Sequence, residues 1–397
     1  MIQSYRNKFN KNFTPKKYDE LLKNLIKGLP SISFRIAETP VFIPVALKDK
    51  LIDAGEQIIK LIRQPEFKAL TQNAIPPQWI VPAENDHPHF LTFDFAVCKD
   101  DLGELTPKLI ELQGFPSLYA FQPHLAKAYQ QTYSIEDIAE LSPYFNNFNE
   151  CAYIELLKKV VLGKHQPHQV ALMDVDAPHQ KTIIDFQLTQ QLTGCKILSL
   201  TDILKEGKQL FYIENGKKTQ LKRIYNRLIF DEIADKTTLF EKCFDPREEL
   251  EIEWATHPNW FYRISKYTMP FLKHDFVPET RFLNEINKIP DDLENFVLKP
   301  LFSFAGQGVI IDVDQAAIKS INDPENWILQ RKVNYEPVIQ ALDGNVKTEI
   351  RLMYLWPDGE EPQLCMNLVR LSRGKMIGVR YNQDFDWVGG SVGLMDS

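Results

Sequence analysis

The sequence has few of the features that mark metal ribbons, secreted scaffolds or membrane proteins. Its 397 residues include only five cysteines, none in a C-x-x-C pair. This excludes a zinc ribbon or a disulfide framework and predicts reduced, mostly buried thiols. No apolar run reaches the roughly 18 to 20 residues of a membrane helix, and the N-terminal MIQSYRNKFNKNF lacks the apolar core of a secretory signal. We therefore expect no membrane contact and a cytoplasmic location.

An excess of positive charge is also missing. The chain has 46 Lys and Arg against 53 Asp and Glu, a formal net charge of -7. This balance argues against broad electrostatic capture of nucleic acid or of an anionic membrane, although a local basic site remains open. Hydrophobic residues make up 44% and charged residues 25%, as in ordinary globular proteins, and the length suits about two to three domains.

The first third of the chain changes from helical to strand periodicity. Apolar residues at helical spacing predict helices over Tyr18–Ile26 and Leu47–Ile62. A cluster of three prolines near residue 80 then interrupts any helix. Beyond it, alternation over Phe90–Val97 and Lys108–Gln113 predicts the two strands of a hairpin with a long loop between them.

The middle of the chain predicts a small parallel sheet. From residue 168 an apolar run, a helical segment over Lys181–Leu192, Gly194 and a short apolar run follow one another, which is typical of a βαβ unit. Asn215-Gly216 marks a hairpin turn. These elements predict a mixed α+β and α/β architecture. We divide it into residues 1–80, helix-rich; 81–165, with the acidic strands; 166–235, a small α/β domain; and 236–397, a strand-rich part.

A glycine loop is the most informative string. In FVLKPLFSFAGQGVIIDVD (296–314) an apolar run ends at Lys299, a flexible loop follows, and a β-branched run resumes over Val309–Val313. The lysine precedes the loop and a strand follows it, so neither the P-loop nor the dinucleotide fingerprint fits. The backbone N–H groups of Gly306, Gln307 and Gly308 could approach phosphate oxygens, with the Lys299 charge at the loop's base. A plain hairpin with a glycine turn is the alternative.

Two acidic strands form a second candidate feature. Alternation places Thr92 and Asp94 on one face of the first hairpin strand and Glu111 and Gln113 on one face of the second. If the apolar faces pack on the core, Asp94, Glu111 and Gln113 converge as an oxygen cluster on the open face. Mg²⁺ prefers such hard oxygen ligands. Simple amphipathic alternation is the alternative interpretation.

The glycine loop resembles that of ATP-grasp enzymes, in which a strand lysine and this loop contact the nucleotide phosphates. The segment HPNWFYRISKYTMPFLKHDFVPET is similar to the part of that superfamily that carries its first nucleotide lysine. The resemblance implies that Lys266 and Lys299 are the two nucleotide lysines. The string WILQRKV (327–333) resembles the hinge strand that receives adenine, which implies that Gln330 and Lys332 contact the nucleotide.

The order of these motifs resembles the circularly permuted ATP-grasp group, which includes the synthetase half of glutathionylspermidine synthase. IELQGFPS is similar to the family's Glu-x-Asn magnesium element with Gln113 in place of Asn, and Asp94 matches its partner Asp. These ligands lie before the lysines instead of after them. Thr92 stands where the glutathionylspermidine branch has an arginine. The implied fold is a circularly permuted ATP-grasp fold with a small Rossmann-like pre-ATP-grasp domain and a helical N-terminal segment.

The resemblance implies a ligase that uses ATP and Mg²⁺ to join a carboxylate to an amine-type nucleophile through an acylphosphate. Arg370 in NLVRLSRGK aligns best with the family arginine near the transferred phosphate, and Arg351 in TEIRLMYL is the next candidate. The implied partners are ATP and small-molecule or peptide carboxylates and amines, without nucleic acid or membrane, and a homodimer is compatible with it. A small-molecule kinase on the same fold and a non-catalytic nucleotide-binding protein are the alternatives.

Overall fold

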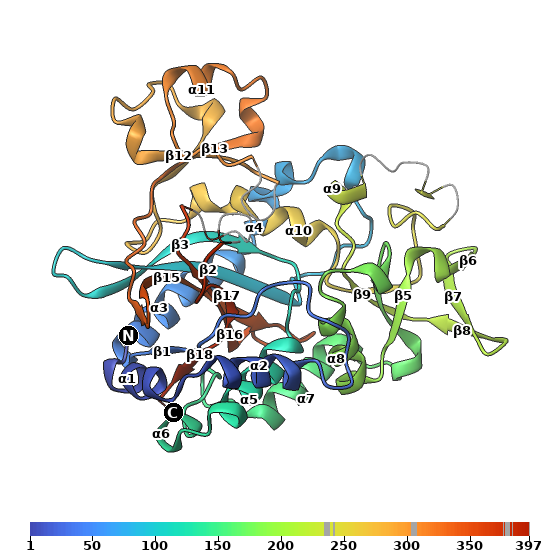
Figure 1. The fold of residues 1–397 in the computed structure, drawn as a ribbon. Coiled ribbons are helices and arrows are strands. Elements are labelled where there is room, and N and C mark those ends of the chain that lie inside the picture. The colour runs from blue at the N-terminus through green and yellow to red at the C-terminus, as the bar shows by residue number, and fades with distance from the viewer. Residues whose placement is uncertain are drawn as a thin grey trace.

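The computed structural model describes residues 1–233, 239–240, 243–302, 308–375, 377, 382 and 384–396 (Figure 1). The predicted loop residues Gly306 and Gln307 lie outside the described residues. Over the described ranges the chain forms five sheets with helices packed around them, a mixed α/β architecture. None of the helices in these ranges combines the length and the apolar composition that crossing a bilayer requires.

The largest sheet is antiparallel and joins strands from both ends of the chain. Its order is β17-β16-β15-β2-β3, with β14 paired to β15. The predicted hairpin is confirmed by β2 and β3, but the long loop expected between them is wrong. The strands run to Lys99 and restart at Leu105, and Asp100 closes the short turn by accepting the backbone N–H groups of Leu102 and Glu104. The six strands are β2 (Phe90–Lys99), β3 (Leu105–Gln113), β14 (Ile339–Ala341), β15 (Gly344–Leu355), β16 (Gln363–Ser372) and β17 (Gly389–Ser391).

Two of the N-terminal helices, α1 and α3, contact this sheet, and α2 packs on α5 (Phe121–Tyr133). The two predicted helices are confirmed as α2 (Pro15–Leu25) and α3 (Val45–Ile62). Thr14 begins α2 by accepting the backbone N–H of Lys17, with a proline in the first turn. Strand β1 (Val41–Ile43) pairs in parallel with β18 (Gly393–Met395), so the two ends of the chain are joined. The first helix is α1 (Gln3–Asn12).

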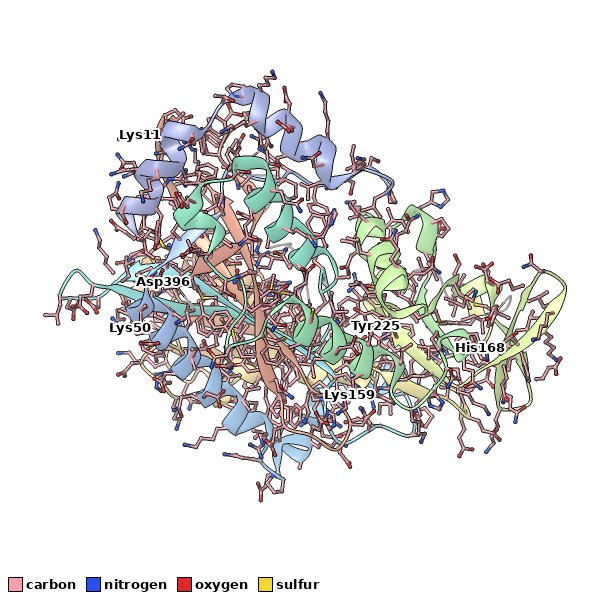
Figure 2. The ribbon with its side chains drawn as sticks, turned by 90° about the horizontal axis from the view of Figure 1, so that it is seen from below. Lys11, Lys50, Lys159, His168, Tyr225 and Asp396 are labelled. Carbon is pink, nitrogen blue, oxygen red and sulfur yellow. The ribbon has the colours of Figure 1, made fainter. Side chains whose placement is uncertain are left out.

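The predicted βαβ unit is also confirmed. Strands β4 (Val170–Asp174) and β5 (Lys196–Ser199) are parallel and are linked by α8 (Ile183–Thr193). They lie in a four-stranded parallel sheet of order β10-β9-β4-β5, with β9 (Arg223–Asn226) and β10 (Glu253–Ala255). Beside it lies an antiparallel sheet of β6 (Leu204–Glu206), β7 (Gln209–Glu214) and β8 (Lys217–Leu221). Figure 2 shows this part, with His168 and Tyr225, on the side away from Lys11.

The Asn215-Gly216 turn is confirmed as the connection between β7 and β8. Both of its residues have positive φ, 51° and 76°, as a two-residue turn of type I′ requires. Asparagine and glycine tolerate this conformation better than other residues, which is why the dipeptide marks the turn in the sequence.

The fifth sheet stands apart at the top of Figure 1 and carries Lys299. It is antiparallel, with order β11-β13-β12: β11 (Thr280–Phe282), β12 (Phe296–Pro300) and β13 (Trp327–Arg331). One face has its own small core, to which Phe296, Leu298 and Leu329 contribute. The second strand predicted over Val309–Val313 is wrong: this run makes only an isolated bridge from Ile310 to Leu298. The later strand β13 pairs with the opposite edge of β12.

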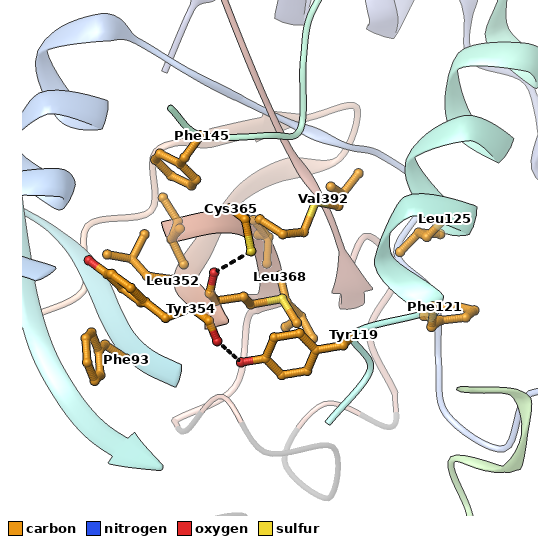
Figure 3. Packing of buried hydrophobic residues seen from close by; sticks show 14 of the residues in the cluster. Phe93, Tyr119, Phe121, Leu125, Phe145, Leu352, Tyr354, Cys365, Leu368 and Val392 are labelled. Atoms are coloured by element: carbon orange, nitrogen blue, oxygen red, sulfur yellow. Dashed lines mark hydrogen bonds between the residues drawn. The ribbon is translucent and has the colours of Figure 1, made fainter. Parts of the chain in front are cut away.

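The main core lies between the largest sheet and the helices below it. The Tyr119 hydroxyl donates to the backbone oxygens of Leu91 and Tyr354, at 2.9 and 3.0 Å, and so ties β2 to β15. Figure 3 shows the bond to Tyr354. All five cysteines are free thiols and three of them are buried, as predicted. The remaining helices are α4 (Phe67–Leu70), α5 (Phe121–Tyr133), α6 (Glu136–Ala139), α7 (Glu150–Leu162), α9 (Phe230–Ile233), α10 (Asn259–Arg263) and α11 (Gln315–Lys319).

Asp185 of α8 holds the start of α5 and yields a first prediction. Its buried carboxylate accepts the backbone N–H groups of Leu118, Ala120 and Phe121. Replacing Asp185 with Ala leaves these donors unpaired, so we expect the free energy of unfolding to fall by about 3 kcal/mol or more. Urea unfolding measures the loss. Asp185→Asn keeps one acceptor oxygen and should lose less; an alanine variant within about 0.5 kcal/mol of wild type would refute this role.

Candidate functional site

Strand register brings the charged residues of the largest sheet to one face. Asp94 on β2 is paired with Glu111 on β3 and with Arg351 on β15. Glu349, two residues before Arg351, is paired with Arg370 on β16. Directly paired residues, and residues two apart on a strand, point to the same side of a sheet. These five side chains therefore share one face, at the centre of the sheet.

Asp94 is the hub of this charge cluster. Its Oδ1 accepts from Nε of Arg351 at 2.6 Å and its Oδ2 from the second guanidinium nitrogen at 2.7 Å, a bidentate pair. Arg370 also donates to Oδ2, at 2.5 Å, and pairs with Glu349. Asp94 is 1% exposed, so the polar face that we expected to be open is covered. The guanidinium groups of Arg351 and Arg370 supply the partners that make this burial tolerable.

The two buried carboxylates of the cluster differ in their affinity for a proton. Burial alone would raise the pKa of Asp94, but the Arg351 and Arg370 guanidiniums hold the pKa of this carboxyl below its usual value. Burial raises the pKa of Glu349, with Arg370 opposing it, and the Tyr335 hydroxyl donates to Glu349 at 2.7 Å. Asp94 is thus the firmly ionised partner of the arginines.

The two predicted nucleotide lysines lie against the acidic hairpin. Lys299 of β12 donates to the backbone oxygen of Ile110, 189 residues earlier, at 3.1 Å. Nζ of Lys266, the first residue of the 3₁₀ helix η7 (Lys266–Phe271), lies 4.0 Å from Oε2 of Glu111. Burial lowers the pKa of Lys299 to about 8, although Glu111 pulls in the opposite direction. The early acidic strands and the later cationic residues therefore meet in space.

The other predicted site residues lie at different distances from the contact between the two lysines and the acidic hairpin. Gln113 donates to Glu111 at 2.9 Å and belongs to the cluster. Gln330 is buried on β13, and its amide contacts the sulfur of Met269 from η7. Lys332 lies at the far end of the β12–β13 pair from Lys299, and its Nζ donates to the backbone oxygen of Glu294.

Gly308 follows β12 at a point where no other residue fits without strain. Its φ is +72°, and a Cβ at this position would lie 3.1 Å from Cγ of Pro300. The glycine therefore allows the chain to return close to the strand that carries Lys299. Of the three predicted loop glycine and glutamine positions, only this one is among the described residues.

Two hollows of very different size flank the cluster. The one beside Glu111, Gln113 and Lys266 has a volume of only about 30 Å³. The one on the side of Arg351 and Arg370 has a volume of about 500 Å³. The charge cluster therefore has almost no free space on the side of Lys266 and a large cavity on the side of Arg370.

Several residues of the site were missed by the sequence reasoning. The sequence does contain a signal for Glu349, because in T-E-I-R it stands two residues before Arg351 and so falls on the same face of a strand. Tyr335 had none, since it lies outside any regular element. The string at 389–393 reads G-x-S-x-G, but its Ser391 is buried on β17 and donates to the backbone oxygen of Thr39 at 2.6 Å. It forms no strand-to-helix nucleophile elbow.

The site's oxygen ligands suit a metal ion only in part. Both Asp94 oxygens are bound by arginines, whereas Glu111 contacts only the Gln113 amide and, at 4.0 Å, the Lys266 ammonium among the contacts described above. Over the described residues, no three His, Cys, Asp or Glu side chains gather as a metal shell. Mg²⁺ needs only one or two carboxylates when phosphate oxygens and water complete its octahedron. Glu111, with the Gln113 amide oxygen after a flip, fits that requirement.

Comparison with known proteins places the fold. No protein-family model matches the chain, and no curated protein matches its sequence. The structure is similar to that of a glutathione synthetase-like effector from Globodera pallida, solved in its apo form, with a TM-score of 0.61. The match covers 96% of each chain at 8% sequence identity. The chain therefore has a glutathione synthetase-like, mixed α/β fold.

Proposed function

We propose that the chain is an ATP- and magnesium-dependent ligase that joins a carboxylate to an amine-type nucleophile through an acylphosphate. The observation that carries the proposal is the contact between the acidic hairpin and Lys266 and Lys299, next to the two arginines. These charges come from three separate parts of the chain. A likeness to a glutathione synthetase-like effector supports a ligase-type fold but does not by itself give the activity.

The charge balance of the site favours an anionic ligand. Four cationic side chains face three carboxylates: Arg351, Arg370, Lys266 and Lys299 against Asp94, Glu111 and Glu349. Buried cations in excess stabilise a triphosphate and the negative charge that moves during phosphoryl transfer.

We infer that nucleotide binding separates the small sheet from the acidic hairpin. The 30 Å³ hollow beside Lys266 has room for about one water molecule, not for a triphosphate. The sheet of β11, β12 and β13 has its own core, so it can move as one body. On this account Lys299 leaves the Ile110 oxygen, and Lys266 leaves Glu111, to contact phosphate oxygens.

The proposed reaction has two balanced steps. A substrate carboxylate oxygen attacks the γ-phosphorus, the bond from that phosphorus to the bridging oxygen breaks, and ADP leaves. An amine nitrogen then attacks the acyl carbon, phosphate leaves, and the nitrogen loses a proton to solvent. Arg370 and Arg351 bind the substrate carboxylate and the transferred phosphoryl group, because a guanidinium fork matches their paired oxygens. Mg²⁺, held by Glu111 and Gln113, would neutralise phosphate charge.

We also propose that the fold is a circularly permuted ATP-grasp fold. In support, β2 and β3 precede β12 in the chain, and yet Lys299 of β12 contacts β3. Strands β15 and β16, which follow β12 in the chain, lie in the same sheet as β2 and β3. The parallel sheet of β4, β5, β9 and β10 would then be the Rossmann-like neighbouring domain. Gln330 would lie where the hinge strand receives adenine.

The experiment that tests the function is a phosphate-release assay. The full chain is incubated with ATP, Mg²⁺ and pooled carboxylates and amines. A ligase releases phosphate only when both substrates are present. A kinase leaves a stable phosphorylated product without an amine, and a nucleotide-binding protein shows ATP affinity without turnover. Nucleotide binding without turnover is the second candidate function. It is favoured by one observation: both oxygens of Asp94, a predicted magnesium ligand, are already bound by arginines.

The pKa of Lys299 predicts how ATP binding depends on pH. With a pKa of about 8 in the folded chain, Lys299 is charged below that pH and loses its proton as the pH rises through it. A triphosphate prefers the charged form, so we expect ATP affinity to fall above about pH 8, by up to roughly tenfold per unit. Calorimetry between about pH 7 and about pH 9.5 measures this. Lys299→Arg stays charged and should flatten the profile, and a flat wild-type profile would contradict the assignment.

A further inference from the structure

A large cavity opens on the arginine side of the charge cluster. Its volume is about 500 Å³, which is in the range of small-molecule sites. Its lining residues come from β16, β17, the start of α5 and the segment after α2, among others. Its walls are mostly apolar, and the charged side chains Arg351 and Arg370 line one part of it. The apolar side chains are Phe34, Leu118, Phe121, Leu368, Leu371 and Val388.

Arg370 faces this cavity with unused hydrogen-bonding capacity. Its side chain is 31% exposed, and its buried Nε has no hydrogen-bond partner within the described ranges. Its neighbour on β17 is Gly390, so no side chain stands opposite it on that strand. An anionic group in the cavity can therefore reach a guanidinium that Asp94 and Glu349 already hold in place.

Gln122 supplies a second polar position in the same cavity. It lies in the first turn of α5, which Asp185 fixes, and it is 1% exposed. Its Oε1 has no hydrogen-bond partner among the residues that the structure describes. A buried acceptor without a donor is costly, and a ligand with an O–H or N–H group would remove that cost.

The residues that line the cavity limit the charge that the ligand's hydrogen-bond donor can carry. The cavity has Arg35, Lys181, Arg351 and Arg370 along its wall, but no acidic residue among the described ones. An ammonium group would lose its hydration there without gaining a counter-ion. The donor that reaches Gln122 must therefore be neutral.

We propose that this cavity binds the carboxylate substrate, and that this substrate is a monocarboxylic acid with an apolar body and a neutral hydroxyl or amide donor. The carboxylate contacts Arg370, the body lies between Phe34, Leu118 and Leu368, and the donor bonds to Gln122. This inference rests on the proposed ligase function. It excludes zwitterionic amino acids and strongly polar peptides as the carboxylate substrate.

Calorimetric titration of the full chain without nucleotide tests the assignment with four matched probes. Para-hydroxyhydrocinnamate has the acid, the ring and the hydroxyl. Hydrocinnamate lacks the hydroxyl, L-tyrosine adds an ammonium, and the primary amide of para-hydroxyhydrocinnamate lacks the charge. We expect the first probe to bind most tightly and each of the others to bind about tenfold more weakly or worse.

Two variants locate the binding in the cavity. Gln122→Met keeps the shape but removes the acceptor, so the preference for the hydroxylated acid over hydrocinnamate should disappear. Phe34→Ala removes a half-buried wall residue and should weaken the binding of both acids about tenfold. Phe211→Ala, in the distant sheet of β6, β7 and β8, is the control and should change neither.

The outcomes separate this inference from the proposed function. Equal affinity for all four probes, or binding that Phe34→Ala leaves unchanged, overturns the cavity assignment. Absence of acid binding in a chain that binds ATP and releases phosphate with other carboxylates also overturns it, and leaves the ligase intact. Acid binding with the expected preferences supports the assignment, even if no ATP-dependent turnover follows and the ligase proposal fails.

Discussion

Replacing Asp94 with Ala should lower the free energy of unfolding by about 3 to 5 kcal/mol. The Asp94 carboxylate is the bidentate partner of Arg351, which is itself buried, and a partner of Arg370. Its removal leaves a guanidinium away from water without a counter-charge, a larger loss than that of a single neutral hydrogen bond. Urea unfolding followed by circular dichroism gives the difference in stability.

The Asp94 experiment has a matched control in the same part of the chain. Asp86 is fully exposed and lies 3.8 Å from Lys68, so Asp86→Ala should leave the free energy of unfolding almost unchanged. A similar small effect for Asp94→Ala would show that the carboxylate is not the hub of the cluster. Arg351 would then have to find another partner.

Replacing Glu111 with Gln should lower ATP-dependent phosphate release by roughly 10² to 10³-fold. Glu111 is the one carboxylate of the cluster that no arginine holds, and it contacts Lys266 and Gln113 at the edge of β3. The neutral amide keeps the shape but not the charge that a phosphate-bound Mg²⁺ requires. Since the side chain is partly exposed, we expect the variant to fold as the wild type does.

Glu104 of the same hairpin provides the comparison. It lies in the exposed turn between β2 and β3, 3.7 Å from Lys50, and Glu104→Gln should retain the full rate. Rates are measured at saturating ATP over a range of Mg²⁺ concentrations. If Glu111→Gln keeps wild-type turnover at every concentration, Glu111 does not hold the metal and the site must be assigned differently.

Local patterns were sufficient for the elements whose partners are close in the chain. The hairpin of β2 and β3, the βαβ unit and the Asn215-Gly216 turn each follow from periodicity and turn residues within a few tens of positions. The strand expected over Val309–Val313 failed for a physical reason. Its β-branched run favours strand, and Ile310 does bridge Leu298 on the edge of β12 opposite β13, but the chain bends directly after Ile310, so the pairing does not extend into a strand.

The site could be predicted only where strand register follows from a hairpin. Asp94 and Glu111 lie opposite each other because one short turn joins their strands. The pairing of Asp94 with Arg351 depends on the register of two strands from opposite ends of the chain, which periodicity does not give. Gln122 and Phe34 contribute through the packing of α5 and the N-terminal segment, so no local motif marks them.

The central claim is that Lys299 and the acidic hairpin bind one triphosphate between them. Calorimetric titration of ATP with Mg²⁺ into the wild type, Lys299→Ala and Lys108→Ala tests it most directly. Lys108 of β3 also donates to a backbone oxygen, that of Asp275, at 2.6 Å, but lies outside the cluster. We predict that Lys299→Ala weakens ATP binding by about 1.5 to 3 kcal/mol, the value of a charge-assisted contact, and that Lys108→Ala has no effect. Equal ATP affinity in all three proteins would contradict the account.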